Sequence, residues 1–142
     1  METDFVKVKD VMQTSLHMVN GLASVERAID MMNEHNVSSL VIERRHDGDE
    51  FGFVTVQGIA KWVISENKST ARTSVYEIMT KPALTLNGEM NVKYATRLLA
   101  RLELNRALVV DGEGLAGLVT LRDLVLNHPK ESGAKAGKDS SD

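Results

Sequence analysis

The 142-residue sequence contains no cysteine. This absence excludes a disulfide framework, a thiolate metal site and a cysteine nucleophile, and it agrees with a reducing compartment. Long apolar runs are also missing, and residues 1–9 alternate charged with apolar side chains where a signal region would be basic and then hydrophobic. The sequence therefore predicts a soluble, cytoplasmic protein.

The sequence also lacks a large excess of positive or negative charge. Lysine and arginine number 17, and aspartate and glutamate number 20, which leaves a formal net charge of -3 at pH 7. Such a balance gives no electrostatic attraction to nucleic acid or to an anionic membrane. Neither is expected as a partner.

Patterns for catalysis and for metal binding are lacking. The four histidines have no His-x-x-x-His spacing, and no serine lies in a nucleophile-elbow motif. Residues 46–50 (HDGDE) place acidic side chains at alternate positions, as calcium loops do, but the further ligands are missing, which favours a hairpin turn. The sequence predicts no enzyme, no catalytic cofactor and no metal site.

What the sequence does contain is an internal repeat. Residues 8–12 (VKDVM) align with residues 75–79 (VYEIM) at an offset of 67 positions, and residues 52–55 (GFVT) align with 117–120 (GLVT) at an offset of 65. The slip falls inside the polar stretch 43–50, and a length change confined to a loop is what a structural repeat tolerates.

Each copy shows the pattern strand, helix, strand, strand, helix. In the first copy, Ser24 is the expected N-cap of the first helix. Apolar spacing predicts the elements and the core faces of the helices. For the first copy these are strands 16–19, 40–42 and 51–54, a helix with Val25, Ala28, Ile29 and Met32 inward, and a helix with Val56, Ile59, Ala60 and Val63 inward. For the second copy they are strands 84–86, 107–110 and 115–119, a helix with Val92, Ala95, Leu99 and Leu102 inward, and a last helix beginning with Leu121, Leu124 and Val125.

The predicted fold is therefore α/β (α+β), with two tandem β-α-β-β-α repeats packed about a pseudo-two-fold axis. Neither copy alone buries both of its helix faces and its sheet, so the copies are expected to pack together. The expected boundaries are 6–66 for the first repeat, 67–74 for a linker and 75–128 for the second repeat. The chain changes character at Pro129, because residues 130–142 contain no large apolar side chain, and residues 129–142 are expected to form a disordered tail.

The repeat resembles a known family, the CBS-domain pair or Bateman module, over roughly residues 6–127. The resemblance rests on the two openings at 8–12 and 75–79, on residues 105–111 (NRALVVD) and on residues 117–123 (GLVTLRD), in that order. It implies a stand-alone intracellular regulatory module that binds an adenosine derivative such as AMP, ADP, ATP or S-adenosylmethionine in the cleft between its repeats. It also implies a homodimer.

The residues after the last predicted strand suit a phosphorylated sugar. Thr120 is the expected N-cap of a helix, and Asp123 is its third residue. The free amides of the first turn favour a phosphate, while a carboxylate accepts hydrogen bonds from two ribose hydroxyls. The same two residues form a capping-box pattern that stabilises helices in proteins without a ligand, and this alternative stays open. Gly117 would let a ligand or a neighbouring backbone approach closely.

The first copy keeps Gly52 and Thr55 but has Gly58 at the place of the aspartate. Losing two hydrogen bonds to a charged group weakens binding by about 3 to 6 kcal/mol, so one good site per chain is expected, with Thr55 marking a weaker second one. A neutral substitute from Gln57, or room for a different ligand beside Gly58, stays open.

The resemblance implies further walls of the site. The adenine is expected against the first strand of the second repeat and near the entry to the next strand, and a lysine is expected near a phosphate. These residues are Pro82, Ala83, Leu84, Arg106, Ala107 and, for the phosphate, Lys81. Ordinary surface positions for the two basic residues, and core positions for the two alanines, are the alternatives.

The leading hypothesis is a nucleotide sensor that signals to a partner protein by a change of conformation or oligomeric state. The alternative is a dimerisation or docking platform with a vestigial pocket. Trp62 is expected to lie partly buried at a repeat or subunit boundary, because large aromatic side chains are enriched at interfaces.

Overall fold

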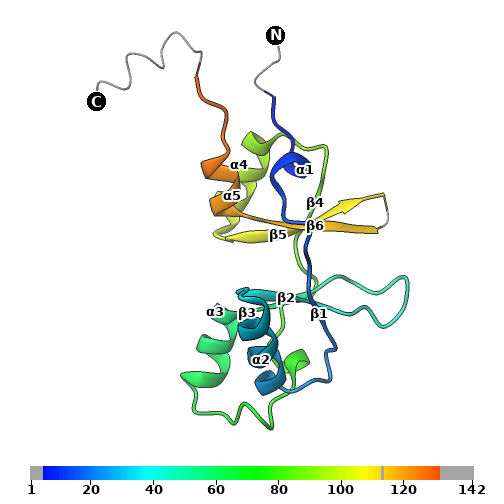
Figure 1. Cartoon of the computed structure of the whole chain (residues 1–142), viewed down its shortest axis with the longest axis vertical. Helices are drawn as coiled ribbons and strands as arrows, with labels where there is room; N and C mark the ends of the chain where they lie inside the picture. Colours follow the sequence, from blue (N-terminus) through cyan, green and yellow to red (C-terminus); the bar gives the residue numbers. More distant parts are fainter. Residues whose placement is uncertain (1–4, 113, 132–142) are drawn as a thin grey trace. The chain divides into compact units, whose positions relative to one another are not determined.

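The computed structural model describes residues 5–112 and 114–131 (Figure 1). The chain divides into two compact units, one formed by residues 15–84 and the other by residues 5–14 with 85–131. In the ranges described, no helix is long and apolar enough to cross a membrane. Of the predicted tail at residues 129–142, residues 132–142 lie outside the described part of the chain.

The unit of residues 15–84 contains a three-stranded mixed sheet in the order β1-β2-β3, with β1 parallel and β3 antiparallel to β2. Its elements are β1 (Met18–Val19), α2 (Val25–His35), β2 (Ser39–Ile42), β3 (Phe53–Thr55), α3 (Val56–Ile59), the π-helical turn η2 (Ala60–Ile64) and the 3-10 turn η3 (Val75–Glu77). The hairpin predicted between β2 and β3 is present.

Local signals explain where α2 starts and ends. The Ser24 hydroxyl accepts a hydrogen bond from the Arg27 amide at 3.0 Å, as predicted for the N-cap. The helix ends at Asn36, whose φ of 54° is the left-handed conformation common at helix C-termini. Between these caps, Val25, Ala28 and Met32 are buried in one cluster with residues of β2 and β3.

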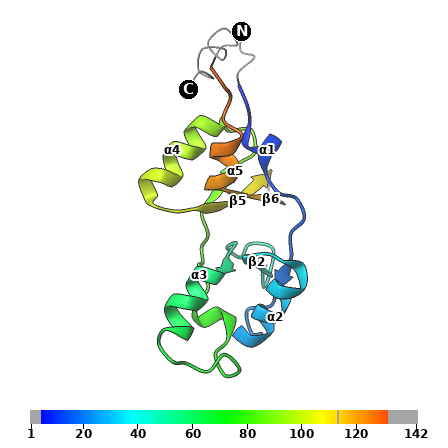
Figure 2. The same ribbon diagram turned by 60° about the vertical axis from the view of Figure 1, so that its left-hand side comes forward.

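The other unit repeats this arrangement. Its sheet has the order β4-β5-β6, with β4 parallel and β6 antiparallel to β5. Figure 2 shows α4 and α5 side by side next to β5 and β6. The elements are α1 (Val8–Val11), β4 (Thr85–Asn87), α4 (Val92–Leu102), β5 (Arg106–Asp111), β6 (Gly114–Thr120) and α5 (Leu121–Leu126). The predicted α/β class, with two β-α-β-β-α repeats that each form a three-stranded mixed sheet, is confirmed.

The opening segment of each repeat pairs with the last strand of the other repeat. The Gln13 amide donates to the Leu118 carbonyl at 2.8 Å, and the Leu118 amide donates back at 2.9 Å. Thr80 and Phe53 exchange the equivalent two bonds at 2.8 and 3.0 Å. Each compact unit therefore contains the opening segment of the other sequence repeat, so the units and the repeats have different boundaries. The repeat boundaries at 6–66 and 75–128 stay a prediction.

Four positions of the predicted apolar faces are wrong. Leu102, Val56 and Val125 are 50%, 49% and 53% exposed, and Ala60 is exposed as well. Leu102 and Val56 are the last and first residues of their helices, Ala60 is the C-cap of α3, and Val125 lies in the last turn of α5. Helical periodicity continues past the point at which packing stops, so it overestimates the core at helix ends. Trp62 is also 49% exposed within its unit.

Candidate functional site

The end of β6 and the start of α5 hold Thr120 and Asp123 together. The Thr120 hydroxyl accepts from the Asp123 amide at 3.0 Å, and the Thr120 amide donates to Asp123 Oδ2 at 3.2 Å, which completes a capping box. Gln13 Nε2 donates to the same carboxylate oxygen at 2.9 Å. Sequence reasoning missed Gln13, because no local pattern links residues that are 110 positions apart.

Arg106 and Ala107 lie at the same edge of this sheet. Arg106 is directly opposite Thr120 across the β5–β6 ladder, and Ala107 is opposite Val119. Burial lowers the pKa of the Arg106 guanidinium, and the Asp123 carboxylate opposes this shift. Ala107 is fully buried, which is the core role left open for it, while Arg106 is half-buried and electrostatically coupled to Asp123.

This arrangement offers a half-buried carboxylate beside a cation. Asp123 Oδ2 accepts two hydrogen bonds, whereas Oδ1 accepts none from the residues that the structure describes. An ionised carboxylate has room for about four hydrogen bonds. The site is therefore able to take hydroxyl donors from a small polar ligand.

The equivalent place in the other unit lacks both charges. Ser39 is opposite Thr55, where the second repeat has Arg106 opposite Thr120. The Thr55 hydroxyl accepts from the Gly58 amide at 2.9 Å and caps α3, and Gly58 offers no carboxylate. The weaker ligand binding predicted for this copy therefore has a second expected cause, because Ser39 stands where the other unit has Arg106.

The structure places Lys81, Pro82, Ala83 and Leu84 in the unit of residues 15–84. Ala83 is buried, and its amide donates to the Phe51 carbonyl at 2.7 Å, so this segment runs beside the start of β3. Lys81 Nζ forms an ion pair with Asp49 Oδ2 at 2.8 Å, and the lysine side chain is only 14% exposed. Lys81 is thus held by a carboxylate, although it was predicted to meet a phosphate.

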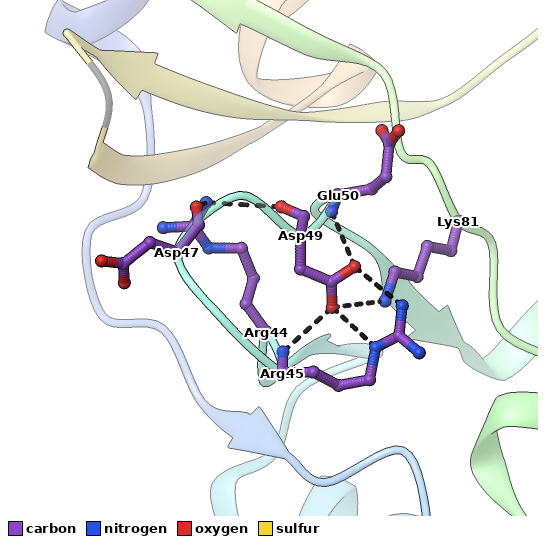
Figure 3. A network of polar contacts seen from close by, with 6 residues as sticks. All are labelled: Arg44, Arg45, Asp47, Asp49, Glu50 and Lys81. Atoms are coloured by element: carbon purple, nitrogen blue, oxygen red, sulfur yellow. Dashed lines mark hydrogen bonds and ion pairs between the residues drawn. The ribbon is translucent and has the colours of Figure 1, made fainter.

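Asp49 is the centre of a polar network that sequence reasoning missed (Figure 3). Its carboxylate is 3% exposed. Oδ2 accepts from the Arg45 amide at 2.9 Å, from Arg45 Nε at 3.1 Å and from Lys81, and Oδ1 accepts from Arg45 Nη2 and from the Glu50 amide. The Arg45 side chain and amide, followed by Lys81, hold the pKa of this carboxyl far below its usual range. The predicted hairpin loop is therefore a fixed structure.

Acidification is expected to destabilise the unit of residues 15–84 through Asp49. Because its folded pKa is depressed, its stabilising effect is complete above the unfolded pKa of about 3.9 and is lost as the pH falls through the folded pKa. Circular dichroism melts between pH 6 and pH 2.5 should show a steeper fall of the wild-type Tm than of the Asp49→Asn Tm. Asp47→Asn, in the same loop, should follow wild type, and parallel curves for all three proteins would contradict the expectation.

Metal binding has no evident place in the described part of the chain, where no group of three or more histidine, aspartate or glutamate side chains is suited to hold an ion. The sequence pattern at residues 46–50 favours a hairpin turn over a calcium loop. In the structure, both carboxylate oxygens of Asp49 in this segment accept hydrogen bonds from the donors named above.

Known proteins share both the sequence and the fold. The chain is 28% identical over 127 residues to the CBS domain-containing protein YhcV of Bacillus subtilis, which covers 89% of each protein. It superimposes with a TM-score of 0.85 and 28% identity on the hexameric CBS-CP12 protein from bloom-forming cyanobacteria, covering 96% of this chain and 78% of that one.

A second solved structure is the CBS domain pair of protein MJ0100 in complex with 5'-methylthioadenosine and S-adenosyl-L-methionine. The TM-score is 0.74, with 24% identity and coverage of 94% of this chain and 98% of that one. At this identity the likeness shows the fold. The CBS domain profile matches residues 8–65 and 75–128, which together span most of the sequence. The chain therefore belongs to the CBS domain family and carries a pair of CBS domains.

Proposed function

We propose that the chain is a non-catalytic regulatory module that binds an adenosine-type nucleotide through Thr120 and Asp123. The observation that carries this proposal is the half-buried Asp123 carboxylate, fixed through Oδ2 by Gln13 and Thr120, with Oδ1 accepting no bond within the described residues. The vicinal hydroxyls of a ribose are suitable donors for such an oxygen. A helix N-terminus and Arg106 beside it favour the phosphate of the same ligand.

The capping box does not compete with this role. Its two bonds use the Asp123 amide and one carboxylate oxygen, so the residue stabilises α5 and still offers the second oxygen to a ligand. The structural alternative from the sequence and the binding role are therefore compatible in one side chain.

The ligand class is AMP, ADP, ATP or S-adenosylmethionine. The MJ0100 domain pair, which has this fold, binds two adenosine derivatives, and this supports the class for the present chain. One ligand per chain is expected, because Thr55 is accompanied by Gly58 and Ser39 in place of Asp123 and Arg106. The roles that the resemblance implies for Lys81, Pro82, Ala83, Leu84 and Ala107 stay predictions.

Signalling is proposed to proceed through a homodimer or a partner protein. A ligand shifts such an equilibrium only by its difference in affinity for the two states. The CBS-CP12 relative is hexameric, which supports oligomer formation in this family. Trp62, which is 49% exposed within its unit, is the candidate contact residue. If no ligand binds, this exposed aromatic side chain favours the second candidate function, a docking platform.

Nucleotide binding is expected to raise the Tm of the wild-type chain and to depend on Asp123. A ligand at a hundredfold excess over its Kd stabilises the folded state by about 2.7 kcal/mol. Asp123→Ala should weaken binding about 10- to 100-fold, since it removes a charged hydrogen-bond acceptor. The measurement is the ligand-induced change in Tm with AMP, ADP, ATP and S-adenosylmethionine, compared within each variant, because loss of the cap lowers the unliganded Tm as well.

Asp30→Ala is the matched control, because Asp30 is an exposed carboxylate on α2. It should leave the ligand-induced shift unchanged. If none of the four ligands moves the wild-type Tm, nucleotide sensing is wrong and the docking platform is the better account of this chain.

A further inference from the structure

The unit of residues 15–84 has a groove of about 570 Å³ beyond the carboxyl ends of β1 and β2. Most of its lining comes from residues 20–22, which follow β1, and from residues 42–45 at the end of β2. The opening segment of the second repeat supplies the rest. The lining residues are Asn20, Gly21, Leu22, Ile42, Glu43, Arg44, Arg45, Tyr76, Met79 and Lys81.

This groove lies at the opposite end of the sheet from Thr55. Strand β2 runs from Ser39, which is opposite Thr55, to Ile42, which borders the groove. The carboxyl ends of neighbouring parallel strands are a common place for ligands in open α/β sheets. The groove is therefore distinct from the copy of the Thr-x-x-Asp motif in this unit.

One wall of the groove is cationic and fixed in place. Arg44 Nη1 donates to the carbonyls of Asp47 and Asp49 at 2.6 and 3.3 Å, and its guanidinium lies 4.4 Å from the Phe51 ring centroid. The Asp49 carboxylate accepts hydrogen bonds from Arg45 and Lys81 and so holds both cations in place (Figure 3). The fixed guanidinium groups and the ammonium group reduce the entropy that an anion must remove on binding.

Donors remain on this wall after Asp49 is satisfied. A guanidinium has five N–H groups, and Asp49 uses those of Arg45 Nε and one of Nη2. An ammonium has three N–H groups, of which Lys81 gives one to Asp49. Among the charged side chains that line the groove, the three cations Arg44, Arg45 and Lys81 outnumber Glu43, whereas Asp47 and Glu50 of the same loop are not among the lining residues. This chemistry suits a phosphate, which arginine binds through paired N–H groups.

Other lining residues of the groove are aromatic or apolar. Tyr76 is half-exposed and Met79 is half-buried, whereas Ile42 is only 3% exposed. Arginines alone would indicate a site for any anion. An exposed aromatic side chain in the same groove as the cations favours a ligand with a ring at one end and an anion at the other.

We propose that this groove binds a phosphate monoester that has a planar ring at its other end, as AMP does, with the phosphate on Arg45 and Lys81 and the ring on Tyr76 and Met79. Asp49 is a positioning residue that holds the two cations. The proposal goes beyond the proposed function, because it uses neither Thr120 nor Asp123. It gives the first repeat a ligand site of its own, although that repeat lacks the aspartate of the motif.

The test is an NMR titration of the full ¹⁵N-labelled chain with AMP, following the amides of Gly21 and Arg44 for the groove and of Leu121 for the proposed nucleotide site. In Asp123→Ala, the groove amides should still shift. In Arg45→Gln, the Kd from the groove amides should rise tenfold or more, while the Kd from Leu121 stays unchanged. Arg72→Gln, at an exposed arginine of the same unit outside the groove, should match wild type.

Adenosine and inorganic phosphate, titrated separately, should each bind the groove at least tenfold more weakly than AMP. Tyr76→Leu should weaken AMP and leave phosphate unchanged, which keeps the test independent of Asp49 and its partners. Groove amides that do not respond to AMP, or that respond equally in Arg45→Gln, would overturn this inference alone. A silent Leu121 with shifting groove amides would instead overturn the proposed function.

Discussion

Replacing Leu99 with alanine is expected to lower the free energy of unfolding by about 2 to 5 kcal/mol. Leu99 lies in α4 and is fully buried, together with Val92 and Ala95 on the same face. Truncation removes three carbons from a packed core and leaves a cavity that the surrounding residues fill only in part. Urea denaturation followed by circular dichroism should show a lower midpoint with an unchanged slope.

Leu102→Ala is the control within the same helix. Both leucines belong to the apolar stripe predicted from the sequence, but Leu102 is 50% exposed at the end of α4. Its truncation should change the stability by only about 0.5 kcal/mol, as is usual at a surface position. Equal losses at the two positions would show that the apolar stripe, as the sequence predicts it, is buried along its whole length.

Elements with local signals were predictable from the sequence. Ser24 and Thr120 cap their helices as expected, because an N-cap hydroxyl is recognised within four residues of chain. The β2–β3 and β5–β6 hairpins also follow from alternating apolar residues around a polar turn. In each case, the residues that decide the structure are neighbours in the sequence.

Contacts between distant segments were not predictable in the same way. Gln13 approaches Asp123, and Lys81 approaches Asp49, across 110 and 32 positions of the chain. Neither pair belongs to a motif, and a single sequence carries no signal of such pairings. The polar loop at residues 43–50 suggested only a turn from the sequence. It contains the buried Asp49 carboxylate, whose partners are Arg45 in the same loop and Lys81 in a segment beyond α3.

Both long-range contacts result from the exchange of opening segments between the two repeats. It brings Gln13 to β6 in one unit and residues 80–83 to β3 in the other. Each unit thus receives, from the other sequence repeat, one side chain that contacts its key carboxylate: Gln13 at Asp123 and Lys81 at Asp49. The repeats use equivalent segments to support carboxylates at non-equivalent places, which gives the two units different binding chemistry.

Replacing Gly117 with alanine is expected to cost about 3 kcal/mol, at the upper end of the usual range for overpacking. A Cβ atom at this position would lie 2.6 Å from the Gln13 carbonyl oxygen and 2.7 Å from Met12 Sδ. The sulfur belongs to a flexible side chain, but the carbonyl belongs to the backbone that pairs with Leu118. The opening segment must therefore move away from β6. Calorimetry should show a Tm lower by about 10 °C for a chain of this size.

Gly114→Ala in the same strand provides the control, because its Cβ atom would meet only the Asp111 carbonyl oxygen, at 3.9 Å. Its Tm should stay close to that of wild type, and equal losses in the two variants would contradict the steric explanation. The displacement in Gly117→Ala has a second consequence, since Gln13 then no longer donates to Asp123. Nucleotide affinity should fall in this variant at temperatures where it is still folded, because the carboxylate loses one of the two bonds that orient it.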